Sequence, residues 1–185
     1  MSGRIVRCLS IHANYRCRHS GACCTAGWPI QDDRGGPLPL NERGCVFHNA
    51  DAHRCEIQLA DGHDALPLAC RQFPRVSLTD PTGTSVTLSH FCPTALAMLS
   101  EHDGPITIVD DAPAFPATGE YVGLDARDTL PPLLRPGMLM DWDSWREWER
   151  LSIEMFNRDE TPAAVIGRLA IAVELARTGR RPRAR

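Results

Sequence analysis

The chain has 185 residues, of which 43% are hydrophobic and 23% are charged. These proportions are ordinary for a folded globular protein and exclude a largely disordered chain. The 20 basic residues, all of them arginine, and the 23 acidic residues give a net charge of -3, so the composition provides no overall positive field for nucleic acid.

The N-terminal 20 residues carry four arginines and no apolar run of signal-peptide length. No later stretch approaches the ~20 consecutive apolar residues that a membrane-spanning helix needs. We therefore expect a cytoplasmic protein without membrane contact. In a reducing cytoplasm, clustered thiols bind metal or carry out redox chemistry more often than they form disulfides.

The first part of the chain predicts little regular structure. Residues 1–44 contain many turn formers and predict an irregular loop. Short apolar pieces at 45–47 and 54–57 predict a hairpin whose arms would bring Cys45 and Cys55 together. Residues 66–73 then predict a helical turn that Pro74 ends.

A second hairpin is predicted from residues 75–78 and 85–89, which flank a turn-forming segment. Val86 and Leu88 alternate on one face of its return strand, as in a half-buried strand. The return strand leads to Cys92, and the following proline predicts a helix over 94–101. Residues 106–109 predict one more strand.

The C-terminal half predicts a proline-rich connector and two helices. Ser144 and Glu147 form a capping-box pattern, and large apolar residues follow at three- and four-residue intervals. These are Trp145, Trp148, Leu151 and Met155, a stripe that indicates a buried helix face. The second helix is predicted to begin at Thr161 and to end at Gly179, with its apolar face formed by Val165, Leu169, Ala172 and Leu175.

These elements predict an α+β protein, in which a small irregular cysteine-rich metal-binding module with short hairpins is followed by a C-terminal helical pair. We expect the metal-binding domain over residues 1–110, the connector over 111–140, and the helical pair, packed on the domain, over 141–179. Residues 180–185 are expected to form a basic frayed tail.

All eight cysteines lie in the first half of the chain, between Cys8 and Cys92. This segregation indicates a shared metal site or disulfide framework in one folding unit. No Cys-x-x-Cys pair is present, which disfavours a zinc ribbon and a thioredoxin-like dithiol. Cys23 and Cys24 are adjacent, and we expect their side chains to diverge and to fit poorly on one tetrahedral ion. They fit better if each binds a different iron of a cluster, or if one is a ligand and the other is buried.

Four ordered blocks of residues form a specific pattern. Residues 15–24 read Tyr-Arg-Cys-Arg-His-Ser-Gly-Ala-Cys-Cys, and Gly-Cys-Val-Phe at 44–47 is followed by Arg-Cys-Glu-Ile at 54–57. Residues 66–75 read Leu-Pro-Leu-Ala-Cys-Arg-Gln-Phe-Pro-Arg, and 91–93 read Phe-Cys-Pro. Together the blocks resemble the YkgJ-type cysteine-cluster family, a zinc- or iron-chelating domain.

This resemblance has two departures. Ser20 stands where the family usually has its second cysteine, a place that Cys8 could fill, and the arginine usual before Pro67 is absent. Residues 66–93 are also similar to the cysteine-cluster part of flagellin lysine-N-methylases, and that similarity implies an iron-sulfur cluster.

The predicted metal ligands are Cys17, Cys23, Cys24, Cys45, Cys55, Cys70 and Cys92. The alternative for each is a buried, inert thiol, and Cys8 is expected to be such a core residue. His90 is considered as a ligand or as a hydrogen-bond donor beside the ligands, and His19, His48, His53 and His63 are expected to be exposed. Arg71 and Arg75 could lower thiolate pKa values or bind an anion.

The predicted cofactor is an iron-sulfur cluster, most simply 4Fe–4S, because seven or eight thiols exceed the four that one zinc ion takes; zinc is the alternative. The predicted function is metal binding with a redox or accessory role. A lysine N-methyltransferase-like enzyme and a structural zinc module that docks an unknown protein partner are the alternatives. Because residues 8–92 have little apolar periodicity, we expect their folding to depend on the metal.

Overall fold

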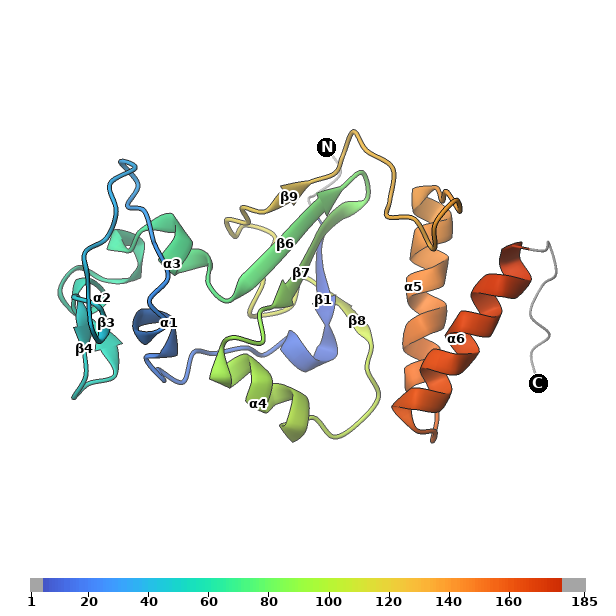
Figure 1. Cartoon of the computed structure of the whole chain (residues 1–185), viewed down its shortest axis with the longest axis horizontal. Coiled ribbons are helices and arrows are strands. Elements are labelled where there is room, and N and C mark those ends of the chain that lie inside the picture. The colour runs from blue at the N-terminus through green and yellow to red at the C-terminus, as the bar shows by residue number, and fades with distance from the viewer. Residues whose placement is uncertain (1–4, 178–185) are drawn as a thin grey trace. The chain divides into compact units, whose positions relative to one another are not determined.

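The computed structural model describes residues 5–177, and these form a mixed α+β protein, as predicted. These residues form two compact units (Figure 1). The first unit contains residues 5–78, 83–103 and 108–124, and the second contains 79–82, 104–107 and 125–177. No helix within residues 5–177 has the length and apolar character needed to cross a membrane.

A five-stranded sheet has the strand order β8-β1-β7-β6-β9. Its strands are β1 (Val6–Leu9), β6 (Arg75–Asp80), β7 (Gly83–Leu88), β8 (Ile108–Asp110) and β9 (Leu124–Asp125). β1 runs parallel to β7, with Val6 opposite Thr84, and antiparallel to β8. The predicted hairpin of β6 and β7 and the predicted strand near 108 are confirmed, whereas the prediction of a loop at residues 6–9 is wrong.

The hydrophobic core of the first unit lies on β1 and β7. Thr84, Val86 and Leu88 alternate with more exposed residues along β7, which confirms the predicted face. Val6 and Phe115 are fully buried in the same cluster. The short 3-10 helix η1 (Ser10–His12) contacts α4 (Pro93–Glu101), which Pro93 opens at its first position as predicted.

Between β1 and β6 the chain forms only short elements. They are α1 (Ala22–Thr25), β2 (Leu40–Asn41), β3 (Gly44–Cys45), β4 (His48–Asn49), β5 (Arg54–Cys55), α2 (Glu56–Asp61), η2 (His63–Ala65) and α3 (Leu68–Gln72). Figure 1 shows these elements gathered beside one another. α3 confirms the predicted helical turn.

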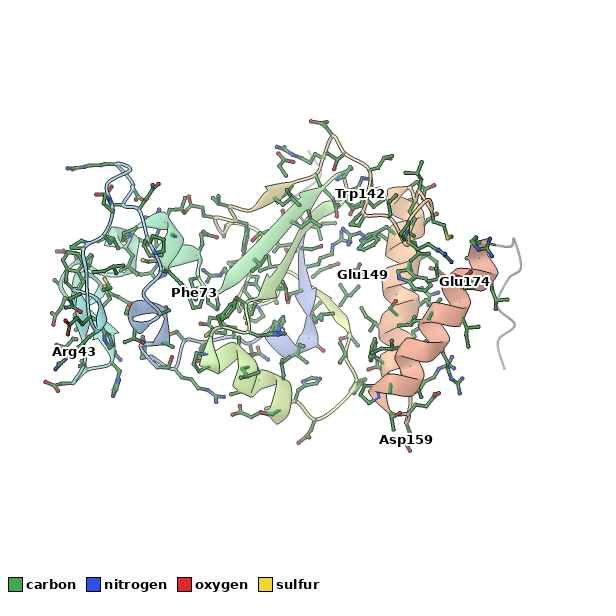
Figure 2. All side chains as sticks on the ribbon, viewed as in Figure 1. Arg43, Phe73, Trp142, Glu149, Asp159 and Glu174 are labelled. Atoms are coloured by element: carbon green, nitrogen blue, oxygen red, sulfur yellow. The ribbon has the colours of Figure 1, made fainter. Side chains whose placement is uncertain are left out.

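The second unit contains helices α5 (Trp142–Phe156) and α6 (Pro162–Arg177), which pack against each other and carry Glu149 and Glu174, respectively (Figure 2). α5 begins before the predicted cap at Ser144, because the Asp141 carboxylate accepts a hydrogen bond from the Ser144 N–H at 2.7 Å. Met155, Val165 and Ala172 are buried, so the predicted apolar faces are used. The predicted stop at Gly179, the tail at 180–185 and the first four residues lie outside the described residues.

A buried ion pair joins α5 to the tip of the β6–β7 hairpin within the second unit. The Asp80 side chain is 0% exposed and forms an ion pair with the Arg146 guanidinium. Asp80 Oδ1 also accepts hydrogen bonds from Thr82 N at 2.7 Å and Thr82 Oγ1 at 2.6 Å. Glu149 accepts a further hydrogen bond from Arg146 at 2.9 Å. Both charged groups therefore have several polar partners.

We expect Arg146→Met to lower the free energy of unfolding of the second unit by about 3–5 kcal/mol, because it leaves the Asp80 carboxylate buried and unpaired. Urea unfolding followed by tryptophan fluorescence measures this, since Trp142, Trp145 and Trp148 all lie on α5. Arg150→Met is the matched control on the same helix, where the side chain is 53% exposed and pairs with Glu147 and Glu154. Equal losses in the two variants would contradict the assignment.

Candidate metal centre

All seven predicted ligands line a single cavity of about 310 Å³ in the first unit. They come from separate segments of the chain and are Cys17, Cys23, Cys24, Cys45, Cys55, Cys70 and Cys92. Every one of them is a free thiol. Thiols 75 positions apart in the sequence therefore meet at one place, which is what a shared inorganic centre requires.

Cys8 is the one cysteine outside this lining. It lies on β1 opposite Val109, is 5% exposed, and belongs to the hydrophobic core. Burial raises its pKa to about 11, and the negative charge of Asp110 adds to this effect. Because Cys8 lies outside the cavity, the structure does not bring it to the place of the thiol missing at position 20. Ser20 itself lines the cavity, and its hydroxyl accepts a hydrogen bond from Ala22 N at 3.4 Å.

The adjacent pair Cys23 and Cys24 lies on the one-turn helix α1. Gly21 precedes this helix in a left-handed conformation, and its carbonyl accepts hydrogen bonds from Cys24 N at 2.9 Å and Thr25 N at 3.1 Å. The two sulfur atoms are 3.9 Å apart, so the expectation that the two thiols diverge is wrong. Neighbouring residues differ by about 100° around a helix, not by the half-turn of a strand. Two thiolates bound to one tetrahedral zinc ion by bonds of about 2.3 Å have their sulfur atoms about 3.8 Å apart, which is close to the separation seen here.

Cys45 and Cys55 belong to two separate small ladders, which corrects the predicted hairpin. Cys45 on β3 pairs with Leu40 on β2, and Cys55 on β5 pairs with His48 on β4. The β4–β5 ladder is extended by a hydrogen bond from Glu56 N to the carbonyl of Phe47 at 2.7 Å, after which α2 begins. One turn precedes Gly44 and another precedes Arg54, so the chain forms two ladders where the apolar pattern predicted one. Both thiols still reach the same cavity.

Two close approaches of the backbone connect these ladders to α1. A Cβ atom on Gly44, which has φ +107°, would lie 2.3 Å from the carbonyl oxygen of Cys24. A Cβ atom on Gly21, at φ +70°, would lie 2.5 Å from Nε2 of His48. Only glycine permits both the positive φ and the absence of a side chain at these points. The approach at Gly44 places β3, and with it Cys45, directly against the segment that carries Cys24.

Electrostatic coupling shows which thiols are near neighbours. Burial raises the pKa of Cys70 to about 11, with smaller contributions from Cys55, Cys45 and Cys23. The hydrogen bond between Cys23 and Cys24 lowers the pKa of Cys23 to about 6 and raises that of Cys24, to which burial, Cys55 and Cys45 also contribute. Five of the seven thiols therefore form one interacting group around the cavity.

Cys17 and Cys92 form a second group around Tyr15. The Tyr15 hydroxyl lies 3.8 Å from the sulfur of Cys92, which is 5% exposed and immediately precedes α4. Burial is the main cause of a raised Tyr15 pKa, followed by the hydrogen bond with Cys92, with Cys17 contributing further. The exposed thiol of Cys17 accepts a hydrogen bond from the backbone N–H of His19 at 3.3 Å.

Several other residues of the cavity wall were not predicted. His53 and His63 are exposed, as predicted, and also line the cavity with His19, which is half-buried; His48, predicted to be exposed, is half-buried too. Trp28 and Phe73 also line it, with ring centroids 5.2 Å apart. His90 is exposed and is not part of the lining. No sequence signal marks Trp28, because it lies in a segment without periodicity.

The donor set has the chemistry of a soft-metal site. Among residues 5–177, no three histidine, cysteine, aspartate or glutamate side chains are arranged as a complete metal-binding group. The thiols instead surround a cavity that they share. Thiolate is the ligand type that iron-sulfur clusters and structural zinc sites use, so the donor chemistry of these residues, although not their present arrangement, suits either group.

In comparisons with known proteins, no family model, no curated protein and no solved structure matches this chain. The resemblance to the YkgJ-type family stays a hypothesis that rests on the four motif blocks.

We expect Gly44→Ala to open the thiol cavity, because the new Cβ atom would collide with the Cys24 carbonyl. The rate at which Cys24 and Cys45 react with a thiol reagent should rise, measured by mass spectrometry of the labelled protein. Gly35→Ala is the matched control: Gly35 also has positive φ, +82°, but a Cβ atom there meets nothing within 4 Å. Equal labelling of the two variants would show that backbone strain alone, and not the contact with Cys24, explains the effect.

Proposed function

We propose that this chain is a cytoplasmic metal-binding protein, in which thiolates of the first unit hold an iron-sulfur cluster or zinc. The observation that carries the proposal is the convergence of seven of the eight cysteines on one cavity, while the eighth lies in the core. Thiols that served only as core residues would not divide into seven around one cavity and one in the core. The proposed role is redox or accessory.

The coupled thiols are the proposed ligands. Cys23, Cys45 and Cys55 all contribute to the raised pKa values of Cys24 and Cys70, which requires proximity. Four of these suffice for one zinc ion or one 4Fe–4S cluster. An iron-sulfur cluster would supply one-electron transfer, whereas zinc would stabilise the fold. Cys17 and Cys92, around Tyr15, lie at the same cavity and complete the proposed set.

The poor burial of the cysteine-rich segment also supports the proposal. Between residues 14 and 73 the only buried residues are Gly21, Gly44, Leu66 and Pro67. Such a segment gains little from the hydrophobic effect to offset the entropy lost on ordering, about 1–2 kcal/mol per residue. Metal-thiolate bonds provide a different source of stabilisation. The sheet core, by contrast, includes Val6, Val86 and Leu88 and is stabilised by its own apolar packing. We therefore narrow the region whose folding we expect to depend on the metal from residues 8–92 to residues 14–73.

We expect protein purified without oxygen to contain stoichiometric iron or zinc, measured by elemental analysis together with an absorption spectrum. A broad band near ~400 nm would identify iron-sulfur, and a colourless zinc protein would identify a structural zinc module. Replacing Cys23 and Cys24 together by serine should reduce the metal content by at least about half, because it leaves three of the five coupled thiols, fewer than either group takes. Cys8→Ala, which changes a core thiol outside the cavity, should retain the metal. A preparation without either metal would overturn the proposal.

We expect removal of the metal to unfold residues 14–73 selectively. Trypsin should then cleave after the exposed residues Arg34, Arg43 and Arg54 about tenfold faster or more, because local opening exposes the chain to the protease. Cleavage sites and rates are measured by mass spectrometry before and after chelation, and returning the metal is the control that should restore protection. Unchanged cleavage after complete metal removal would reject the metal-dependent folding of this segment.

A further inference from the structure

A second cavity of about 430 Å³ lies in the first unit and shares part of its wall with the thiol cavity. The shared residues are His63, Arg71 and Arg75. The rest of its lining is Asp64, Gln72, Ala114, Pro116, Gly119, Glu120 and Tyr121. Its volume lies in the range of about 300–1,000 Å³ typical of small-molecule sites.

Two arginines of this wall have donors that the protein does not use. Arg71 Nη1 donates to the carbonyl of Asp64 at 2.9 Å, and Arg75 Nη1 donates to the carbonyl of Arg71 at 2.9 Å. The Nε–H groups of both arginines are buried, and within residues 5–177 neither has an acceptor. A guanidinium has five N–H donors in a planar fork, and a buried donor without an acceptor is costly. Both Nε–H groups are covered by protein atoms, so a molecule in the cavity would meet the Nη ends of these side chains.

The positive charge of this pair is only partly neutralised. The carboxylates of Asp33 and Glu120 lie 3.9 and 3.6 Å from Arg71, beyond hydrogen-bond distance, and both side chains are more than half exposed. In the part of the chain that is described, Arg75 has no carboxylate partner; its guanidinium carbon lies 5.9 Å from the centre of the Phe115 ring. Exposed ion pairs at such distances contribute little stabilisation. Both arginines are therefore able to bind another anion.

Hydrogen bonds within the protein hold another part of the cavity wall in place before any ligand binds. Gln72 Nε2 donates to the carbonyl of Glu120 at 2.9 Å, and the Tyr121 hydroxyl donates to the carbonyl of Pro116 at 2.9 Å. A Cβ atom on Gly119 would lie 2.7 Å from that hydroxyl, so the turn leaves no room for a side chain. Ala114 and Pro116 add apolar surface to the lining. The cavity thus combines two arginines and an apolar surface with the carboxylates of Asp64 and Glu120.

We propose that this second cavity binds a small organic molecule through an oxyanion, a carboxylate or a phosphate, whose oxygens accept hydrogen bonds from Arg71 and Arg75. Arginine forks bind both groups in a bidentate manner. The apolar wall holds the body of the ligand. Because α3 carries both Cys70 and Arg71, the bound molecule lies beside the thiol cavity, although its binding requires no metal.

Calorimetric titration of the purified protein with succinate and, separately, with inorganic phosphate tests this inference and distinguishes the two oxyanions. We expect a Kd of about 1 mM or tighter for at least one of them. Arg75→Met, which keeps the length of the side chain and removes its donors, should weaken binding at least about tenfold. Arg34→Met is the matched control, since Arg34 is exposed and lies outside the lining, and it should bind as the unchanged protein does.

Three outcomes would overturn the inference: no binding of either anion at about 10 mM, unchanged binding by Arg75→Met, or an equal loss in Arg34→Met, which would indicate general charge attraction. Far-UV dichroism shows whether each variant folds. If Arg75→Met does not fold, Arg75→Lys replaces it, because lysine keeps the charge but loses the planar fork, and binding should weaken about threefold or more. Metal content, measured on the same samples, reports separately on the proposed metal centre.

Discussion

The contact between Gly44 and the backbone of Cys24 is the constraint on which the thiol cavity depends. Because no side chain separates them, β3 lies directly on the segment that carries Cys23 and Cys24. Gly21 allows a similar approach of His48, the partner of Cys55 in its ladder. A backbone contact at Gly44 and the packing of the His48 ring on Gly21 therefore help to bring thiols from three short segments around one space. This matters because the segment has almost no hydrophobic core of its own.

The first unit thus contains two regions that are held by different forces. Alternating apolar residues on β7 pack with β1 into a conventional core, which includes the inert thiol of Cys8. The cysteine-rich segment is held by turns, two-residue ladders and isolated hydrogen bonds, such as that from Leu68 N to Asp33 at 2.8 Å. The proposed metal would act where the hydrophobic effect is weakest. Helix α3 borders both the proposed metal centre and the proposed oxyanion site, so a ligand at one would lie close to the other.

Sequence patterns predicted the elements whose residues interact with near neighbours. The alternation of Val86 and Leu88 indicated a strand with one buried face, and Pro93 indicated the start of α4; both are confirmed. Predictions that needed the path of the backbone were less successful. The apolar pieces around Cys45 and Cys55 suggested one hairpin, but two turns divide them between two ladders. The strand Val6–Leu9 was missed because its four residues carry only a short alternating pattern.

The sequence by itself determined that the thiols belong to the N-terminal half, that the chain combines short strands with a C-terminal helical pair, and which seven cysteines were the candidate ligands. These conclusions depend on residue type and local spacing. The structure confirms the predicted core position of Cys8. Only the tertiary structure decided that the sulfurs of Cys23 and Cys24 lie 3.9 Å apart and that Arg71 and Arg75 border a second cavity. The reason is physical: cavities and buried groups arise where segments distant in sequence meet, and local patterns do not encode the positive-φ turns and close backbone contacts that make them meet.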